Sequence, residues 1–225
     1  MHKEILVRQI KAMPGVLVTG GHFVYKEWGH GDVYFNKTAL MTRPNISSAI
    51  GQLLADECEE VVGDSGKIKV VMGPVVAGAI LAQWLGYHLS MHTPASDPLD
   101  CVFADKEGDD FIISRGFDKL IYGRDIIVCE DVLNSGGSAR KVVRAARAAG
   151  ANVLGVAAIV NRGGLTAEAL DVPFLTTILD LEANNWHEDN CPLCKQGIPV
   201  NLELGHGKKF LERKKAQTLI AMQTG

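Results

Sequence analysis

Short apolar runs and segments with helical spacing follow one another along the chain. Apolar runs without alternation are typical of parallel strands buried on both faces. Such runs occupy residues 67–72, 126–129, 153–160 and 174–181. Helical spacing covers residues 3–13, 44–62, 79–85 and 139–149. This order predicts an α/β fold with a mainly parallel sheet flanked by helices.

The two ends of the chain follow a different pattern. Residues 20–25 and 32–36 predict two short strands around a glycine-rich turn. From residue 182 onward Trp, Cys, Pro and Gly lie close together, and a polar helix is predicted near 208–222. We therefore expect a single domain, 1–225, made of an N-terminal segment 1–43, an α/β core 44–181 and a tail 182–225.

Composition and charge exclude several classes of protein. Of the 225 residues 47% are hydrophobic and 22% are charged, as in an ordinary globular protein. The net charge of −3 provides no basic field for nucleic acid or an anionic membrane. No apolar stretch approaches ~20 residues, and the N-terminus has no signal-peptide core. Five cysteines, an odd number, favour reduced thiols and a cytoplasmic protein.

Candidate chemistry is concentrated at residues 126–138. Four apolar residues run into the carboxylates Glu130 and Asp131, and a loop rich in Gly and Ser follows, then a helix. Ligands of open α/β sheets bind at the carboxyl ends of the strands. Gly136 and Gly137 allow close backbone approach, so several N–H groups can converge on one anion at the helix N-terminus. A ribose with a 5-phosphate suits both halves, because its hydroxyls can bind the carboxylates and its phosphate the loop.

This arrangement resembles the phosphoribosyl pyrophosphate (PRPP) signature of type I phosphoribosyltransferases: a hydrophobic strand, two acidic residues and a Thr/Ser-Gly-Gly-Ser turn. The resemblance implies the type I phosphoribosyltransferase fold, with residues 1–43 as a small hood. It also implies that Glu130 and Asp131 bind the ribose hydroxyls, with Asp131 as a catalytic residue. The implied phosphate-binding residues are Asn134, Ser135, Gly136, Gly137 and Ser138. From the residues alone, an ordinary strand-turn-helix with surface carboxylates is the alternative.

A second loop follows the predicted strand 67–72. It consists of Gly73, Pro74, Val75, Val76, Ala77 and Gly78. Two loops of small residues at the ends of parallel strands suit a polyphosphate, and in the family this loop contacts pyrophosphate through backbone amides. The family sometimes has a non-proline cis peptide here, and Pro74 leaves open which bond that is. By itself a Gly-Pro strand end is common in α/β proteins.

The N-terminal segment resembles the start of orotate phosphoribosyltransferases. There a Gly-x-Phe strand, a turn, a Tyr and an Asn- or Asp-Lys pair belong to the hood over the base, and residues 21–37 carry this pattern. The resemblance implies base contacts from Lys26, Phe35, Asn36 and Lys37. The alternative is an amphipathic hairpin with core aromatic residues and solvated lysines.

An Asn-Arg-Gly-Gly sequence at residues 161–164 follows the predicted strand 153–160. Orotate enzymes have Asp-Arg and a Gly-containing stretch at this point, and the Arg pairs with the orotate carboxylate. A planar guanidinium suits a carboxylate because it donates two parallel hydrogen bonds. The resemblance thus makes Arg162 the candidate for base specificity, and an exposed Arg at a strand end is the alternative.

Residues 102–116 depart from the family pattern. Orotate enzymes have an Arg-Lys pair, a second Lys and a His-Gly in a mobile catalytic loop at this place. Here Lys106 matches one basic position and Arg115 stands near a later one, but Asp105 replaces the Arg before Lys106 and the loop 104–110 is acidic. Beside a pyrophosphate leaving group this acidity is unfavourable unless Mg²⁺ offsets it. We expect a loop that works differently, weak catalysis or another substrate.

The resemblance implies a glycosyltransferase of the pentosyltransferase class. Its reaction transfers the phosphoribosyl group from PRPP to a nitrogenous base, first of all orotate, giving orotidine 5'-monophosphate and pyrophosphate in pyrimidine biosynthesis. It implies Mg²⁺ bound chiefly by substrate oxygens, and a homodimer in which the catalytic Lys106 reaches the neighbour's site. The alternatives are a phosphoribosyltransferase for another base and a regulator that binds PRPP without chemistry.

The tail contains a Cys-Pro-Leu-Cys sequence at 191–194, with His187 and His206 nearby. A structural zinc site usually needs four ligands, often from two Cys-x-x-Cys pairs. Only one such pair, Cys191 and Cys194, is present, and it can equally be a reduced surface turn. The sequence leaves zinc open and predicts no other metal ligand.

Overall fold

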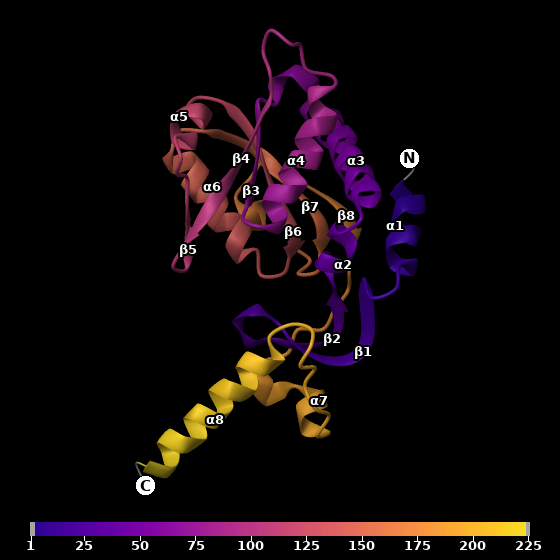
Figure 1. Ribbon diagram of the computed structural model, residues 1–225, viewed down its shortest axis with the longest axis vertical. Helices are drawn as coiled ribbons and strands as arrows, with labels where there is room; N and C mark the ends of the chain where they lie inside the picture. The colour runs from indigo at the N-terminus through magenta and orange to yellow at the C-terminus, as the bar shows by residue number, and fades with distance from the viewer. Residues whose placement is uncertain (1–2, 224–225) are drawn as a thin grey trace. The chain divides into compact units, whose positions relative to one another are not determined.

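The computed structural model describes residues 3–223, which form two compact units (Figure 1). Unit 1 consists of the chain up to Gln9 and of Leu40–Glu182. Unit 2 consists of Ile10–Ala39 and the chain from Ala183 onward. The predicted α/β core 44–181 thus lies in unit 1, whereas most of the predicted N-terminal segment and the tail group together in unit 2.

Unit 1 is built on a six-stranded sheet of order β5-β4-β3-β6-β7-β8. All neighbouring strands are parallel except β4 and β5, which are antiparallel. The strands are β3 (Val70–Pro74), β4 (Asp100–Glu107), β5 (Asp110–Ile112), β6 (Asp125–Leu133), β7 (Asn152–Asn161) and β8 (Phe174–Asp180). This sheet confirms the predicted α/β fold.

Helices cover both faces of this sheet (Figure 1). Val70 and Met72 pack with Val142 of α6 in one core cluster, while Val71 of the same strand lies near Gly86 of α4 on the other face. Successive strand residues point to opposite faces, so each central strand must be apolar throughout. The helices that contact the strands are α3 (Pro44–Val62), α4 (Ala77–Ser90) and α6 (Gly137–Ala148). The other helices before the tail are α1 (Lys3–Ala12), α2 (Lys37–Met41) and α5 (Phe117–Ile121).

The predicted helix 44–62 is confirmed at both ends. Pro44 occupies the first turn of α3, where a missing N–H costs no hydrogen bond. Gly63 follows in the left-handed conformation with φ 74°, and its N–H donates to the Glu59 carbonyl. No helix in the described part of the chain is long and apolar enough to cross a membrane.

Unit 2 contains an antiparallel hairpin of β1 (Leu17–Val24) and β2 (His30–Phe35), which confirms the two predicted N-terminal strands. The tail contributes α7 (Pro192–Lys195) and α8 (Gly207–Gln223). Backbone hydrogen bonds join the tail to the hairpin: Asn201 N–H donates to the His22 carbonyl at 2.7 Å, and His206 N–H to the Val24 carbonyl at 2.8 Å. The two ends of the chain therefore form one unit.

Candidate active site

The candidate site lies at the point where connections leave the sheet in opposite directions. β3 and β6 are neighbours, but β3 leads through α4 to β4 on one side and β6 leads through α6 to β7 on the other. Open α/β sheets bind ligands at the carboxyl ends of the strands at such a switch point. The ladder between β3 and β6 ends at Met72 and Val128, while β6 runs on to Leu133 beside β7. The last residues of β6 therefore border the switch point.

Glu130 and Asp131 stand in this last part of β6. Their side chains are 6% and 3% exposed. Backbone N–H groups hold one oxygen of each: Asp131 N–H donates to Glu130 Oε1 at 3.1 Å, and Val132 N–H to Asp131 Oδ1 at 2.8 Å. Buried carboxylates are uncommon in proteins unless they have a partner or a task. The alternative of surface carboxylates is therefore wrong.

The loop after β6 turns directly into a helix. Residues 134–136 form the bend, and Gly136 adopts the left-handed conformation at φ 72° as the N-cap of α6. Helix α6 begins at Gly137, two residues earlier than predicted, so Gly137 and Ser138 belong to its first turn. That turn contains no acidic residue. Backbone N–H groups and the positive end of the helix dipole thus favour an anion here.

The loop after β3 is shorter than predicted. Gly73 and Pro74 are the last two residues of the strand, and α4 begins at Ala77, so the predicted loop 73–78 is reduced to two residues. Pro74 is tolerated because it ends the strand, where it interrupts no further ladder bond. The peptide bond between Val75 and Val76 is cis, and this is the bond that the sequence left open.

Two glycines, Gly73 and Gly78, allow close backbone approach around this loop. A Cβ on Gly73 would lie 2.1 Å from the Gly78 carbonyl oxygen, so the strand end and the helix start touch backbone to backbone. A Cβ on Gly78 would lie 3.2 Å from the carbonyl oxygen of Cys129, the residue before Glu130. The start of α4 therefore lies against β6, beside the residue that precedes Glu130.

The turn after β7 packs against the loop after β6. Arg162 N–H and Gly163 N–H both donate to the Leu133 carbonyl, at 2.8 and 3.2 Å. A Cβ on Gly163 would lie only 1.7 Å from the Asn134 carbonyl oxygen, so only glycine fits there. The half-buried Arg162 thus stands beside residues 134–138.

Residues 104–110 form a hairpin of β4 and β5 in place of the loop that the sequence predicted. In this hairpin Lys106 pairs with Phe111, and the Lys106 side chain is exposed. Gly108 makes the turn with φ 58°. A Gly-Asp turn between two segments with apolar residues is a hairpin signal that the sequence does contain.

The acidity of this hairpin is offset within unit 1. The Arg115 guanidinium donates to Asp105 through Nε at 3.0 Å and Nη2 at 3.3 Å, and these bonds hold the pKa of the Asp105 carboxyl below its usual value. Arg144 of α6 lies 3.7 Å from the Asp110 carboxylate, and Lys141 Nζ donates to the Asp109 carbonyl.

The four predicted hood contacts lie in unit 2. Phe35 is 4% exposed at the end of β2, as the alternative of an amphipathic hairpin expects. Lys26 is exposed, and Asn36 and Lys37 are half-buried. A base contact by these residues stays a prediction.

The tail cysteines do come together with two histidines, but with others than those expected. Cys191 and Cys194 lie near His22 and His30, whereas His187 lies 3.1 Å from Asp189 with 70% of its side chain exposed. His206 is likewise outside this group. The sequence reasoning missed His22 because it precedes Cys191 by 169 residues.

Comparison with known proteins agrees with this geometry. The chain matches the phosphoribosyl transferase domain family over residues 37–192. Orotate phosphoribosyltransferase of Caldanaerobacter subterraneus subsp. tengcongensis is 30% identical over 184 residues, which cover 82% of this chain and 88% of the relative. The Thermus thermophilus protein of the same name is 32% identical over 180 residues, which cover 80% of this chain and 90% of the relative.

Solved structures show the same fold. Orotate phosphoribosyltransferase of Mycobacterium tuberculosis H37Rv, in complex with Fe(III) dicitrate, has a TM-score of 0.57 at 23% identity, covering 80% of this chain and 96% of that one. Adenine phosphoribosyltransferase of Saccharomyces cerevisiae has a TM-score of 0.59 at 17% identity, covering 78% of this chain and 99% of that one.

The chain therefore belongs to the phosphoribosyl transferase family, and it is an enzyme of the pentosyltransferase class. It transfers the phosphoribosyl group of PRPP to a nitrogenous base. Within the type I phosphoribosyltransferases it is most similar to the orotate phosphoribosyltransferases.

Proposed function

We propose that the base is orotate and that the products are orotidine 5'-monophosphate and pyrophosphate, as in pyrimidine biosynthesis. The observation that carries this proposal is Arg162, half-buried at the carboxyl end of β7 beside residues 134–138. A guanidinium in this place can donate two parallel hydrogen bonds to a carboxylate, and orotate is a base with a carboxylate. The names of the relatives support the same substrate.

PRPP has three parts, and the end of β6 and two loops at the switch point offer a partner for each. The ribose hydroxyls bind the carboxylates of Glu130 and Asp131, which accept hydrogen bonds. The 5-phosphate binds the N–H groups of residues 134–138 at the start of α6. The pyrophosphate binds the backbone of residues 73–78. The position of the start of α4 against β6 supports this division, because one ligand can then reach both strand ends.

The chemistry needs positioning and fixed charges more than a covalent partner. Positive charge grows on the ribose in an oxocarbenium-like transition state, while the leaving pyrophosphate gains negative charge. The carboxylates of Glu130 and Asp131 stabilise the ribose charge in a buried environment, where fixed charges act strongly. The loops hold the leaving group in line with the attacking nitrogen.

Magnesium suits this donor set. Mg²⁺ prefers oxygen ligands and usually binds through one or two carboxylates, waters and substrate phosphates. Glu130 and Asp131 place two carboxylates at the switch point, and the substrate supplies the remaining oxygens. When bound, the ion neutralises part of the charge on pyrophosphate.

Lys106 supplies further positive charge in a homodimer. Its ammonium is exposed on the β4–β5 hairpin, and within residues 3–223 it forms no ion pair. An exposed, unneutralised cation is free to act on the leaving group bound by the neighbouring subunit. None of the five cysteines forms a disulfide, which suits the cytoplasm.

Pyrophosphate release from PRPP, measured with orotate, uracil, adenine and hypoxanthine in turn, tests the substrate. The proposal predicts release with orotate at a rate at least about 100-fold above the other bases, because a base without a carboxylate cannot accept the paired hydrogen bonds of the Arg162 guanidinium. Pyrophosphate release with another base would mean that Arg162 does not select for the carboxylate of orotate. PRPP binding without release for any base would identify a regulator.

A further inference from the structure

Four side chains of unit 2 direct their metal-binding atoms at one point. His22 and His30 come from the hairpin, and Cys191 and Cys194 flank the start of α7 in the tail. Their ligand atoms all lie within 4.8 Å of one another. Two chain segments that are remote in sequence thus contribute two ligands each.

Four of the distances between these atoms can be compared with those of a tetrahedron around one ion. Zn–N bonds of about 2.0 Å and Zn–S bonds of about 2.3 Å place the ligand atoms about 3.3–3.8 Å apart. His22 Nε2 lies 3.6 Å from Cys191 Sγ and 3.7 Å from Cys194 Sγ. His30 Nδ1 lies 3.3 Å from Cys194 Sγ and 2.9 Å from His22 Nε2. Only the last distance is shorter than the tetrahedron requires.

The tautomer of His22 is fixed for metal binding. Its Nδ1 lies 2.7 Å from the Ile198 carbonyl oxygen, which can only accept a hydrogen bond. The neutral ring therefore carries its proton on Nδ1, and the lone pair of Nε2 faces the two sulfurs and His30. Metal-binding histidines characteristically use their second nitrogen in this way.

His30 is held at the cluster by close backbone packing. A Cβ on Gly29 would lie 2.0 Å from Asn185 Oδ1, and a Cβ on Gly31 would lie 2.3 Å from the Asn184 carbonyl oxygen. The glycines on both sides of His30 thus let residues 184–186 approach, and the His30 backbone pairs with Trp186. The Gly-His-Gly sequence at 29–31 positions a ligand.

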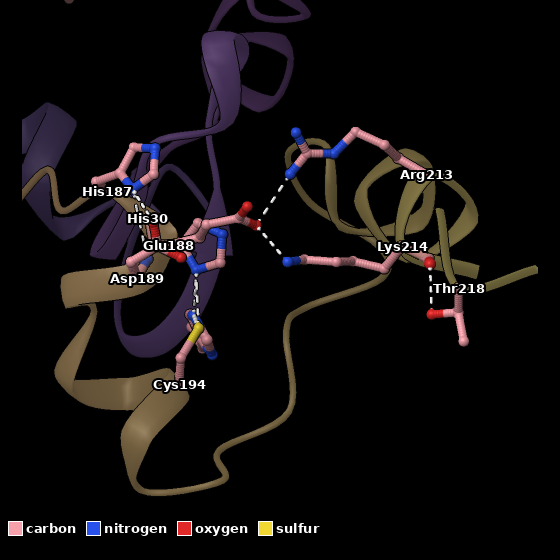
Figure 2. A network of polar contacts seen from close by, with 9 residues as sticks. His30, His187, Glu188, Asp189, Cys194, Arg213, Lys214 and Thr218 are labelled. Atoms are coloured by element: carbon pink, nitrogen blue, oxygen red, sulfur yellow. Dashed lines mark hydrogen bonds and ion pairs between the residues drawn. The ribbon is translucent and has the colours of Figure 1, made fainter. Parts of the chain in front are cut away.

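Three of the four ligands are shielded from water, and only Cys194 lies at the surface. His30 is fully buried and Cys191 is 0% exposed. The Phe210 ring of α8 meets the His30 ring edge-on at 4.8 Å between centroids. Figure 2 shows His30 and Cys194 facing each other, and Glu188 between them and α8, where it pairs with Arg213 at 2.9 Å and Lys214 at 3.1 Å.

We propose that His22, His30, Cys191 and Cys194 form a structural zinc site that fastens the N-terminal hairpin to the C-terminal tail. Two thiolates and two imidazoles in a closed tetrahedron are the donor set of structural zinc. Zinc replaces the two thiol protons, which leave to solvent. The site has no open coordination position for a substrate, so its role is to stabilise unit 2.

The small apolar core of unit 2 is a further reason to expect a stabilising metal ion there. Most buried apolar side chains belong to unit 1, and unit 2 contributes only a few large ones, such as Phe23, Phe35 and Phe210. Small units with small cores commonly need a metal or a disulfide. The match to the phosphoribosyl transferase domain ends at residue 192 and begins at residue 37, so three of the four ligands lie outside it.

Metal analysis of the purified full-length protein is the first test. We expect one zinc per chain by mass spectrometry. Exchange for Co²⁺ should give the absorption bands of tetrahedral cobalt with thiolate ligands. Absence of metal, iron in place of zinc, or cobalt bands without thiolate character would overturn the proposal. Neither measurement needs enzyme activity, so the result is independent of the proposed substrate.

Variants with matched controls locate the site. Cys194→Ser and His22→Ala should lose the bound zinc, whereas Cys101→Ser and His187→Ala should keep one zinc per chain, because both residues lie outside the cluster. Zinc retained in Cys194→Ser, or lost equally in Cys101→Ser, contradicts the assignment.

Hydrogen exchange of the wild-type protein tests the structural role of zinc without any variant that could misfold. A chelator should speed exchange in peptides from residues 17–35 and 183–200, and should leave the β6 and β7 peptides of unit 1 unchanged. Unchanged exchange in the hairpin after complete metal removal would exclude the structural role.

Discussion

Arg115 binds the Asp105 carboxylate through two of its nitrogens, at 3.0 and 3.3 Å. Asp105 is the residue that replaces a basic position of the orotate enzymes, and its charge alone would repel a pyrophosphate. The pairing neutralises that charge within the hairpin. The negative charge at this departure from the family pattern is therefore offset by a cation that follows the same hairpin.

The first prediction concerns this pair. Arg115→Ala should raise the pKa of Asp105 toward its ordinary value, because the Arg115 hydrogen bonds are the largest cause of its lowering. A lowered folded-state pKa stabilises the protein above the unfolded pKa, and this stabilisation is lost as pH falls through the folded value. An NMR titration of the Asp105 carboxyl measures the change directly.

The same variant should also bind PRPP more weakly, with an effect that added salt reduces, because the Asp105 carboxylate then lacks its cationic partner. The double variant Arg115→Ala with Asp105→Asn should regain PRPP affinity. If the double variant binds PRPP no better than Arg115→Ala, the charge of Asp105 is not what Arg115 offsets during PRPP binding.

Asp131→Asn should weaken PRPP binding. A neutral amide replaces a charged acceptor of a ribose hydroxyl, and such a bond contributes roughly 1.5–3 kcal/mol, or about 10- to 100-fold in affinity. Asp125→Asn is the matched control, since Asp125 begins the same strand at its opposite end. If calorimetry gives both variants the wild-type affinity for PRPP, Asp131 is not a ligand of the ribose.

Much of the fold follows from patterns within the sequence. The apolar strands and the capped helix 44–62 depend on neighbouring residues, and they are confirmed. The sequence does not predict the hairpin at 104–112, because charged residues interrupt the apolar pattern of its strands. The cations that pair with these residues, Arg144 and Arg115, lie outside the hairpin. Similarly, no local spacing connects His22 with Cys191, since only the folded tail brings them together.

Gly163→Ala should disturb the phosphate loop. The added Cβ would lie 1.7 Å from the Asn134 carbonyl oxygen, so the backbone of one loop must move. A displacement of about 1 Å in a positioned site can cost on the order of 100-fold in rate. Gly66→Ala is the control, because its Cβ would meet only the flexible Asp64 side chain, at 3.3 Å. Equal kcat/KM for PRPP in both variants would argue against a positioning role for this contact.

Lys106→Ala should slow turnover far more than it weakens PRPP binding, since its charge meets negative charge that grows in the transition state. Mixing it with Asp131→Asn should restore some activity, because a hybrid dimer contains one site with both residues intact. Full activity of Lys106→Ala alone would show that the hairpin has no catalytic part.

The formation of orotidine 5'-monophosphate from orotate, PRPP and Mg²⁺ tests the central claim most directly, with wild type and Arg162→Ala measured side by side. The account predicts product with the wild-type protein. For Arg162→Ala it predicts a KM for orotate raised by about 10- to 100-fold, from the loss of a charge-assisted pair, with PRPP affinity nearly unchanged. Wild-type protein that binds PRPP and forms no orotidine 5'-monophosphate, or an Arg162→Ala variant that loses both substrates equally, would contradict it.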